Sequence, residues 1–219
     1  MNGRELVTSL MRIGGLYGLT AEKFSLGRRN ADVVQAMLDG GIRIIQYREK
    51  TKKMGLKYEE CLHLRAMTRE AGAAFIVNDD IDIAVLVGAD GVHVGQEDLP
   101  VECVRELVGP DMAIGLSTHS PEQARDAIRR GADYIGVGPI FRTYTKDDVV
   151  DPVGFEYLDY VVANHDIPFV AIGGIKEHNL GEVVRHGARC AALVTEIVGE
   201  ANIAAKITAL RNQMEAAKE

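Results

Sequence analysis

Short apolar segments that alternate with amphipathic segments of helical spacing predict an α/β fold for this chain, and within that class a (β/α)8 barrel. The apolar segments show no alternation of polar and apolar residues, which is typical of parallel strands buried on both faces. They begin about 25 residues apart on average, the length of one strand-loop-helix-loop unit in an eightfold (TIM) barrel. A doubly wound open sheet is the alternative arrangement of the same elements.

Eight strands are expected in chain order, at residues 16–19, 42–46, 74–77, 91–94, 113–116, 134–137, 169–172 and 190–194. We expect residues 1–14 to form an extra helix before the first strand, and residues 200–219 to form the last helix with a charged end. The four segments Gly40-Gly41, Gly88-Ala89, Gly131-Ala132 and Gly187-Ala188 repeat one helix ending that leads into a strand. No low-complexity linker interrupts these repeats, so the prediction is a single domain over residues 1–219.

The helix that follows the fifth strand has the clearest start and stop signals. Ser120 is expected to be its N-cap, Pro121 its first helical residue, and Gln123 the partner that completes a capping box. An apolar stripe of Ala124, Ala127 and Ile128 follows, and Gly131 is expected to end the helix in a left-handed conformation.

The amino-acid composition limits the classes of function that this protein can have. The formal net charge of −7 argues against a general nucleic-acid-binding protein, although it leaves a locally positive cleft for phosphorylated ligands possible. The three cysteines Cys61, Cys103 and Cys190 stand singly, as buried apolar residues of a reducing compartment do. No apolar run is long enough to span a membrane, and the first residues lack a signal-peptide core. The expectation is a soluble cytoplasmic protein without nucleic-acid or membrane partners.

Polar residues follow the second strand at 46–50. In an extended chain Gln46, Arg48 and Lys50 share one face, while Tyr47 and Glu49 point away from it. An amide and two cations on one face suit a ligand with a hydrogen-bonding ring and an anionic tail. A solvated surface cluster is the simpler interpretation of the same residues.

Acidic residues follow the third and fourth strands. Because consecutive barrel strands are neighbours, Asp79 and Asp98 can approach one ion, and magnesium usually takes one or two protein carboxylates with phosphate oxygens and waters. Asp80 is instead expected to cap the helix that begins beside it, and Asp82 to be a solvated helix residue.

Further phosphate-compatible groups follow the later strands. Ser117 can donate from its hydroxyl, although a polar turn explains it equally well. Lys146 adds a cation and the threonines at 143 and 145 add hydroxyls in a long loop. Gly174, Val194 and Thr195 follow strands seven and eight, where many barrels bind phosphate through backbone N–H groups.

The histidines are expected to be structural or exposed, except His119 in a loop at the strand ends; His93 alternates with valines and could point into the barrel. Motifs of serine hydrolases, zinc proteases, dinucleotide-binding proteins and P-loop enzymes are absent from the sequence. The predicted site therefore favours a reaction in which fixed charges and hydrogen-bond donors stabilise a phosphorylated leaving group.

The segments QYREK, VNDDIDIA, GADGVHVGQEDLP, IGLSTHS, GADYIGVGPIF, TYTK and AIGGI, in this order and spacing, resemble the thiamine-phosphate synthase family. The likeness extends from about Leu16 to Thr195. It implies a (β/α)8 barrel and a magnesium-dependent transferase of thiamine biosynthesis, which joins 4-amino-2-methyl-5-hydroxymethylpyrimidine diphosphate to a thiazole phosphate and releases pyrophosphate.

The resemblance also implies roles for matching residues. The pyrimidine diphosphate would be contacted by Gln46, Tyr47, Arg48, Glu49, Lys50, Asn78 and Ser117, and magnesium by Asp79 and Asp98. Both the thiazole substrate and the diphosphate would meet Thr143, Thr145 and Lys146, and the thiazole phosphate would lie against Gly174, Val194 and Thr195. Of these, Arg48, Lys50, Ser117 and Lys146 would assist the departure of pyrophosphate. Arg142, in place of the family's usual proline, and Thr195, in place of its usual serine, depart from the pattern.

Two alternatives use the same barrel. A thiazole tautomerase would need an acid or base such as His119 and no paired Asp79 and Asp98. A non-catalytic sensor of a phosphorylated ligand would bind without turnover. The sequence leaves open a homo-oligomer, the choice of manganese over magnesium, and the preference for a carboxylated thiazole.

Overall fold

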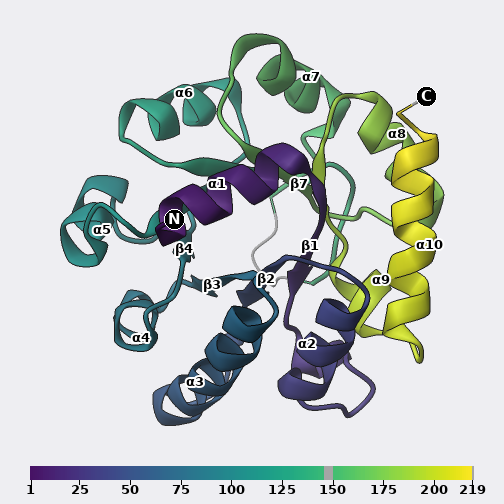
Figure 1. Ribbon diagram of the computed structural model, residues 1–219. Helices are drawn as coiled ribbons and strands as arrows, with labels where there is room; N and C mark the ends of the chain where they lie inside the picture. Colours follow the sequence, from purple (N-terminus) through teal and green to yellow (C-terminus); the bar gives the residue numbers. More distant parts are fainter. Residues whose placement is uncertain (146–149, 219) are drawn as a thin grey trace.

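The computed structural model describes residues 1–145 and 150–218, and within them eight parallel strands form a closed barrel in the order β1 to β8, with β8 paired to β1 (Figure 1). The strands are β1 (Gly15–Leu19), β2 (Ile44–Tyr47), β3 (Ala74–Asn78), β4 (Gly91–Val94), β5 (Ala113–Thr118), β6 (Tyr134–Val137), β7 (Phe169–Ile172) and β8 (Cys190–Ala192). Closure confirms the predicted (β/α)8 barrel, and it excludes the doubly wound open sheet.

Helices surround the barrel on its outside (Figure 1). They are α2 (Asn30–Asp39), α3 (Met54–Glu70), α4 (Ile81–Val87), α5 (Val101–Val108), α6 (Pro121–Arg129), α7 (Gly154–Asn164), α8 (Glu177–Arg185), the short α9 (Val194–Val198) and α10 (Ile203–Ala216), with a 3-10 turn η1 (Glu22–Phe24) after β1. In the part of the chain that the structure describes, no helix combines the length and the apolar character that a membrane crossing requires.

The eight strands lie where the apolar segments predicted them, and the bounds of β1, β2, β3, β5 and β8 differ from the prediction by one or two residues. Strand β2 begins at Ile44 rather than residue 42, because the Ile42 N–H still donates to the carbonyl of Met37 in the turn that ends α2. Strand β8 ends at Ala192 rather than residue 194, because Val194 is the first residue of α9.

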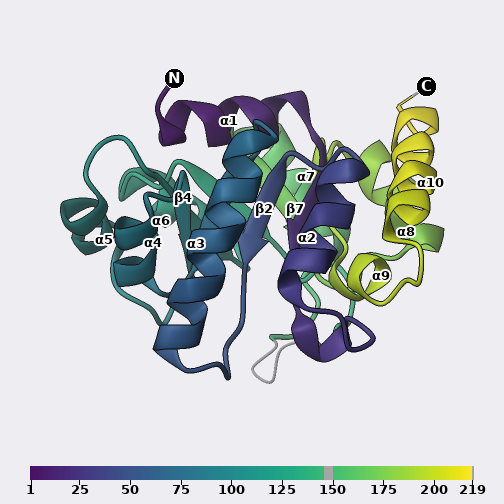
Figure 2. The same cartoon turned by 60° about the horizontal axis from the view of Figure 1, so that its bottom comes forward.

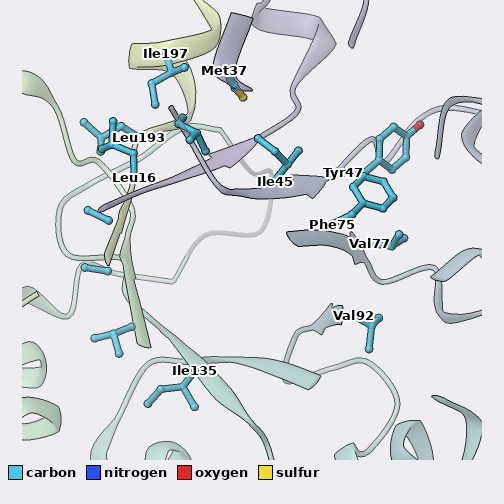
Figure 3. Packing of buried hydrophobic residues seen from close by; sticks show 14 of the residues in the cluster. Leu16, Met37, Ile45, Tyr47, Phe75, Val77, Val92, Ile135, Leu193 and Ile197 are labelled. Carbon is cyan, nitrogen blue, oxygen red and sulfur yellow. The ribbon is translucent and has the colours of Figure 1, made fainter. Parts of the chain in front are cut away.

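Both faces of the barrel wall are buried, which explains the uninterrupted apolar runs. Alternate residues divide between two apolar clusters, one between the wall and the helices and one inside the barrel. Figure 3 shows the outer cluster, with Ile45, Phe75 and Val92 pointing away from the barrel interior. The interior cluster includes Tyr17, Leu19 and other residues of alternate parity.

Helix α1 (Gly3–Ile13) closes one end of the barrel (Figures 1 and 2). Its buried residues Val7 and Met11 belong to the interior cluster, in which they join residues from several strands. Asn2 caps the helix by accepting from the Glu5 N–H, and the Glu5 carboxylate accepts from the Asn2 N–H in return. The helix expected ahead of the first strand therefore covers the amino-terminal ends of the strands.

Helix α6 begins and ends as its sequence predicts, with one correction. The Ser120 hydroxyl accepts from the Gln123 N–H at 3.3 Å, and Gly131 adopts a left-handed φ of 87° after the last turn. The Gln123 side chain does not complete the capping box, because its Oε1 accepts from the His119 N–H at 2.7 Å instead. Gln123 thus fixes the loop that carries His119.

Candidate active site

A cavity of about 300 Å³ opens at the carboxyl ends of the strands, away from α1. Nine of the substrate-contact residues expected from the sequence line it, and they come from six strands and the loops that follow: Gln46, Arg48, Asn78, Ser117, Thr143, Thr145, Gly174, Val194 and Thr195. Apolar side chains such as Leu19, Phe24 and Ile172 complete its wall. The structure therefore brings together groups that lie about 150 residues apart in sequence.

The polar segment at the end of β2 alternates as expected from Gln46 to Glu49, whereas Lys50 does not line the cavity. Gln46 and Arg48 face the cavity, and the Gln46 amide nitrogen donates to the Tyr17 hydroxyl at 2.9 Å. Tyr47 points outward (Figure 3), and its hydroxyl donates to Glu60 Oε2 at 2.7 Å. Glu49 Oε1 accepts from the backbone N–H of Glu22 at 2.9 Å.

These positions separate the residues that the family resemblance had grouped. Neither Tyr47 nor Glu49 lines the cavity, so their placement gives no support to direct contact with a pyrimidine substrate. Their bonds anchor the strand end to α3 and to the turn η1.

The acidic pair after β3 and β4 is close enough for its charges to interact. Burial raises the pKa of Asp79, the neighbouring Asp98 carboxylate raises it further, and Lys50 opposes both. The Lys50 ammonium lies 3.5 Å from Asp79 Oδ2, while Asp98 Oδ2 accepts from the Gly95 N–H at 2.6 Å. A cation between the two carboxylates would relieve their repulsion.

Asp79 also has a left-handed backbone, with a φ of 61°. Its N–H donates to the carbonyl of His93 at 2.9 Å, so that strand β4 holds the conformation in place. Left-handed residues other than glycine cost free energy and are concentrated at functional sites.

Asp80 has a different role from the one expected. It occupies the N-cap position of α4, but its side chain makes no capping bond. Both carboxylate oxygens instead accept from Lys57 Nζ, at 2.8 and 3.1 Å, in a mostly buried pair. The side-chain cap was wrong because a buried lysine on α3 competes for the same oxygens.

The donor set fits magnesium. Among residues 1–145 and 150–218 no three His, Cys, Asp or Glu side chains gather into a metal cluster, which is the arrangement that zinc would need. Magnesium requires less from the protein, because phosphate oxygens and waters complete its octahedron. Two adjacent carboxylates, beside a cavity lined by cations and hydroxyls, meet that requirement.

The end of β5 and the loop after it place two polar side chains on the cavity. Ser117 Oγ lies 2.9 Å from His93 Nε2, and the neighbouring Gln96 amide donates to the Ser117 carbonyl at 2.6 Å. His119 lines the cavity with its Nδ1 2.6 Å from the Gly138 carbonyl. Because a carbonyl only accepts, Nδ1 carries the proton of this contact.

The opposite wall of the cavity is formed by the segments after β7 and β8. Gly173 and Gly174 both have positive φ values, 98° and 65°, and a Cβ on Gly174 would lie 2.5 Å from the Arg142 carbonyl. Lys176 Nζ donates to Thr195 Oγ1 at 2.8 Å and lies 3.1 Å from Glu196 Oε2. This wall offers an ammonium and a hydroxyl to an anion.

The loop after β6 contributes the hydroxyls of Thr143 and Thr145, which lie 2.9 Å apart. Arg142 and the exposed Tyr144 also line the cavity. Lys146, for which the family resemblance implies a catalytic role, lies outside the described residues.

Sequence reasoning missed Tyr17, Tyr134 and Lys176. The first two are hydroxyl-bearing residues in predicted strands, and their interior parity could have identified them once the strands were aligned. Lys176 directly follows the AIGGI segment, and its basic charge at a strand end was the available signal. A parallel barrel whose strand ends gather cations, hydroxyls and paired carboxylates defines an enzyme class that acts on phosphorylated substrates.

Comparison with known proteins identifies the family within this class. The family model described as thiamine monophosphate synthase matches residues 16–197. Thiamine-phosphate synthases from Pelotomaculum thermopropionicum and Lawsonia intracellularis are 65% and 57% identical to the chain over 196 residues, 90% of each sequence. The solved thiamine phosphate pyrophosphorylase from Pyrococcus furiosus superposes with a TM-score of 0.86 at 34% identity, covering 95% of this chain and 99% of its own.

The chain therefore belongs to the thiamine monophosphate synthase family. Membership makes it a transferase of thiamine biosynthesis.

Proposed function

We propose that the cavity joins 4-amino-2-methyl-5-hydroxymethylpyrimidine diphosphate to a thiazole phosphate, giving thiamine phosphate and pyrophosphate. Family membership over residues 16–197 supports this reaction. One structural observation carries it further: a single cavity is lined on one side by Arg48, Asn78 and Ser117 and on the other by Gly174 and Thr195. Two anionic substrates can thus lie against opposite walls, with the reactive carbon of the pyrimidine and the nitrogen of the thiazole between them.

The diphosphate would lie against the wall formed by β2 to β5. Arg48 is half-buried at the cavity, where its guanidinium can grip phosphate oxygens through parallel hydrogen bonds. Lys50, exposed and paired with Asp79 at 3.5 Å, can turn from that carboxylate to the leaving group. Ser117 donates its hydroxyl, and Lys146 supplies a further cation in this proposal.

Magnesium would be held by Asp79 and Asp98, and when bound it would supply Lewis-acid stabilisation of the charge on departing pyrophosphate. Burial and the Asp98 carboxylate keep the pKa of Asp79 raised although Lys50 opposes them, so a divalent cation between the two carboxylates would be favourable. The chain's own cations act on the same developing charge, because preorganised donors in a poorly solvated site stabilise it without reorganisation.

The carbon that loses pyrophosphate becomes a pyrimidine cation, and the thiazole nitrogen attacks it. That nitrogen has no proton to lose, so the reaction needs no general base. Leu19, Phe24 and Ile172 line the cavity with apolar surface that restricts competing attack by water.

The thiazole phosphate would lie against the wall formed after β7 and β8. Gly174 leaves its backbone open to close approach, and Thr195 offers the hydroxyl that already binds Lys176. The usual serine of the family is replaced here without loss of the hydroxyl. Thr143 and Thr145 would contact the same substrate from the loop after β6.

The reaction is tested with purified protein, the two substrates, and either magnesium or EDTA, while thiamine phosphate is measured. We expect magnesium-dependent product. Asp79→Ala and Lys146→Ala should each lower turnover by about 10²-fold, the scale of one preorganised charge. Asp82→Ala is the matched control, because Asp82 is an exposed residue of α4 outside the cavity.

Binding of the thiazole phosphate without any product would refute the proposal. It would favour the tautomerase, for which His119 lies in the cavity, or the sensor.

We also propose that the protein acts in the cytoplasm. Cys61 and Cys190 are buried, as expected, whereas Cys103 is exposed and the expectation of a buried residue was wrong there. All three are free thiols, which supports a reducing compartment. A homo-oligomer remains an expectation, which light scattering of the purified protein tests.

A further inference from the structure

A continuous chain of hydrogen-bonded side chains crosses the barrel interior from Gln46 to Ser117. Gln46 Nε2 lies 2.9 Å from the Tyr17 hydroxyl, and that hydroxyl lies 3.2 Å from the hydroxyl of Tyr134. His93 Nδ1 lies 3.0 Å from the Tyr134 hydroxyl, and His93 Nε2 lies 2.9 Å from Ser117 Oγ. The five residues come from β2, β1, β6, β4 and β5, so no local turn explains their meeting.

The middle of this chain is buried. Tyr17 and Tyr134 are at most 2% exposed and His93 is 8% exposed. Burial raises the pKa of both phenols well above the ordinary value, so each keeps one proton to donate. The barrel also makes room for the chain at Gly115, where a Cβ would overlap the Tyr134 ring and lie 2.5 Å from His93 Nδ1.

Donor and acceptor counting gives the chain a direction. The amide nitrogen of Gln46 can only donate, so Tyr17 accepts from it; when each phenol uses its one proton within the chain, Tyr17 donates to Tyr134. In that arrangement Tyr134 donates to His93 Nδ1, which is then the unprotonated nitrogen of a neutral ring. His93 Nε2 carries the ring proton and donates to Ser117 Oγ.

This direction makes one end of the chain a hydrogen-bond donor to the cavity and the other end an acceptor. Ser117 accepts from His93, so its own hydroxyl proton is available to the cavity as a donor. Gln46 uses its nitrogen on Tyr17, so its amide oxygen is the group available to the cavity as an acceptor. Reversing the chain would turn both ends around: Ser117 would donate to His93, and Gln46 would turn its nitrogen to the cavity.

We propose that Tyr17, Tyr134 and His93 are positioning residues that couple the two ends, so that an anion bound by the Ser117 hydroxyl also presents the Gln46 oxygen to a hydrogen-bond donor. The inference rests on the proposed function in that the anion is taken to be a diphosphate and the donor an amino group on the same substrate. The two orientations hold equal numbers of protons. They interconvert by hydroxyl rotation, an amide flip and exchange of the ring proton with water.

The first test is the tautomer of His93, measured by ¹⁵N NMR of histidine-labelled protein at one fixed pH with magnesium and inorganic pyrophosphate. A His93→Gln sample identifies the resonances. We expect the Nε2–H tautomer in the pyrophosphate complex, and a mixture of tautomers in Tyr134→Phe. A predominant Nδ1–H tautomer in the wild-type complex would overturn the proposal.

The second test is a double-mutant cycle on pyrophosphate affinity, measured by calorimetry. Tyr134→Phe should weaken binding about fivefold in the wild-type background, the scale of one hydrogen bond to a charged group partly lost. It should change binding less than twofold when Ser117→Ala is already present, because Tyr134 acts through Ser117. Equal losses in both backgrounds would show a merely structural role and overturn the proposal, as would a failure of pyrophosphate to bind the wild-type protein.

Tyr157→Phe is the matched control. Its hydroxyl also makes one buried bond, to Thr118 Oγ1 at 2.6 Å, but outside the chain. We expect no change in affinity or tautomer. If Tyr134→Phe fails to fold, as circular dichroism would show, Tyr17→Phe breaks the same chain one residue away and replaces it in both tests.

The proposed function fails separately. If the wild-type protein makes thiamine phosphate but shows no coupling between Tyr134 and Ser117, the proposed reaction stands and the proposed coupling through the hydrogen-bonded side chains is refuted. If Tyr134 and Ser117 are coupled but no thiamine phosphate forms, the proposed coupling stands and the proposed reaction is refuted.

Discussion

Gly115 offers the sharpest test of how tightly the barrel interior is packed. A Cβ added there would overlap the Tyr134 ring at Cζ and lie 2.5 Å from both Tyr134 Cε2 and His93 Nδ1. These are atoms of rigid, buried rings, so whole side chains must move. The residue has an ordinary negative φ, so the effect of Gly115→Ala is steric and not conformational.

The expected cost follows from that overlap. Overpacking a core costs about 1–3 kcal/mol, and contacts this short place Gly115→Ala near the upper end. For a chain of this length each kcal/mol lowers Tm by about 2–4 °C, so we expect a loss of about 6–12 °C. Because the displaced rings are Tyr134 and His93, the KM for the pyrimidine diphosphate should also rise.

Thermal denaturation followed by circular dichroism measures the first effect, and initial rates measure the second. Gly136→Ala is the matched control, since its Cβ would meet His93 Cε1 at 3.4 Å and Ser117 Cα at 3.6 Å, which are ordinary contacts. A Gly115→Ala protein whose Tm and KM equal those of the wild type would refute the packing argument.

Three further predictions concern charged residues at the strand ends. Asp79→Asn should be more stable than the wild type at pH 7 without metal. The folded protein raises the pKa of Asp79, so the wild type loses stability as the pH rises and this carboxyl ionises. Thermal denaturation from pH 3.5 to 8 should show that the advantage of Asp79→Asn vanishes below about pH 3.9, where the carboxyl is protonated in both the folded and the unfolded state. Asp80→Asn should lose about 3 kcal/mol in urea denaturation, because it leaves Lys57 buried without its partner, yet it should keep the magnesium requirement of turnover. Lys176→Met should raise the KM for the thiazole phosphate about tenfold with little change for the diphosphate substrate, because its ammonium lies beside Thr195 and is partly exposed; equal changes in both constants would contradict this assignment.

The sequence predicted the barrel well because its signals were local. Apolar runs buried on both faces, together with glycine helix ends, located all eight strands. The boundary errors at Ile42 and Val194 arose where an apolar residue belongs to a helix turn and not to a strand.

The site could be predicted only as far as its residues follow strand ends. Most of the residues picked on that basis line one cavity, and Asp79 interacts with Asp98 as expected. The partner of Asp80 could not be foreseen, because Lys57 reaches it from another helix. The interior chain of hydroxyls depends on the register of five strands, and single-chain periodicity does not encode that register.

Helix α1 limits the route by which ligands enter and leave the barrel. Val7 and Met11 fill the end that it covers, and the cavity opens at the other end of the barrel. Among the described residues this is the end at which substrates and products would both enter and leave. Whichever product remains bound obstructs the next substrate, so the order of departure, and not only the bond-making step, helps to set how fast the protein can turn over.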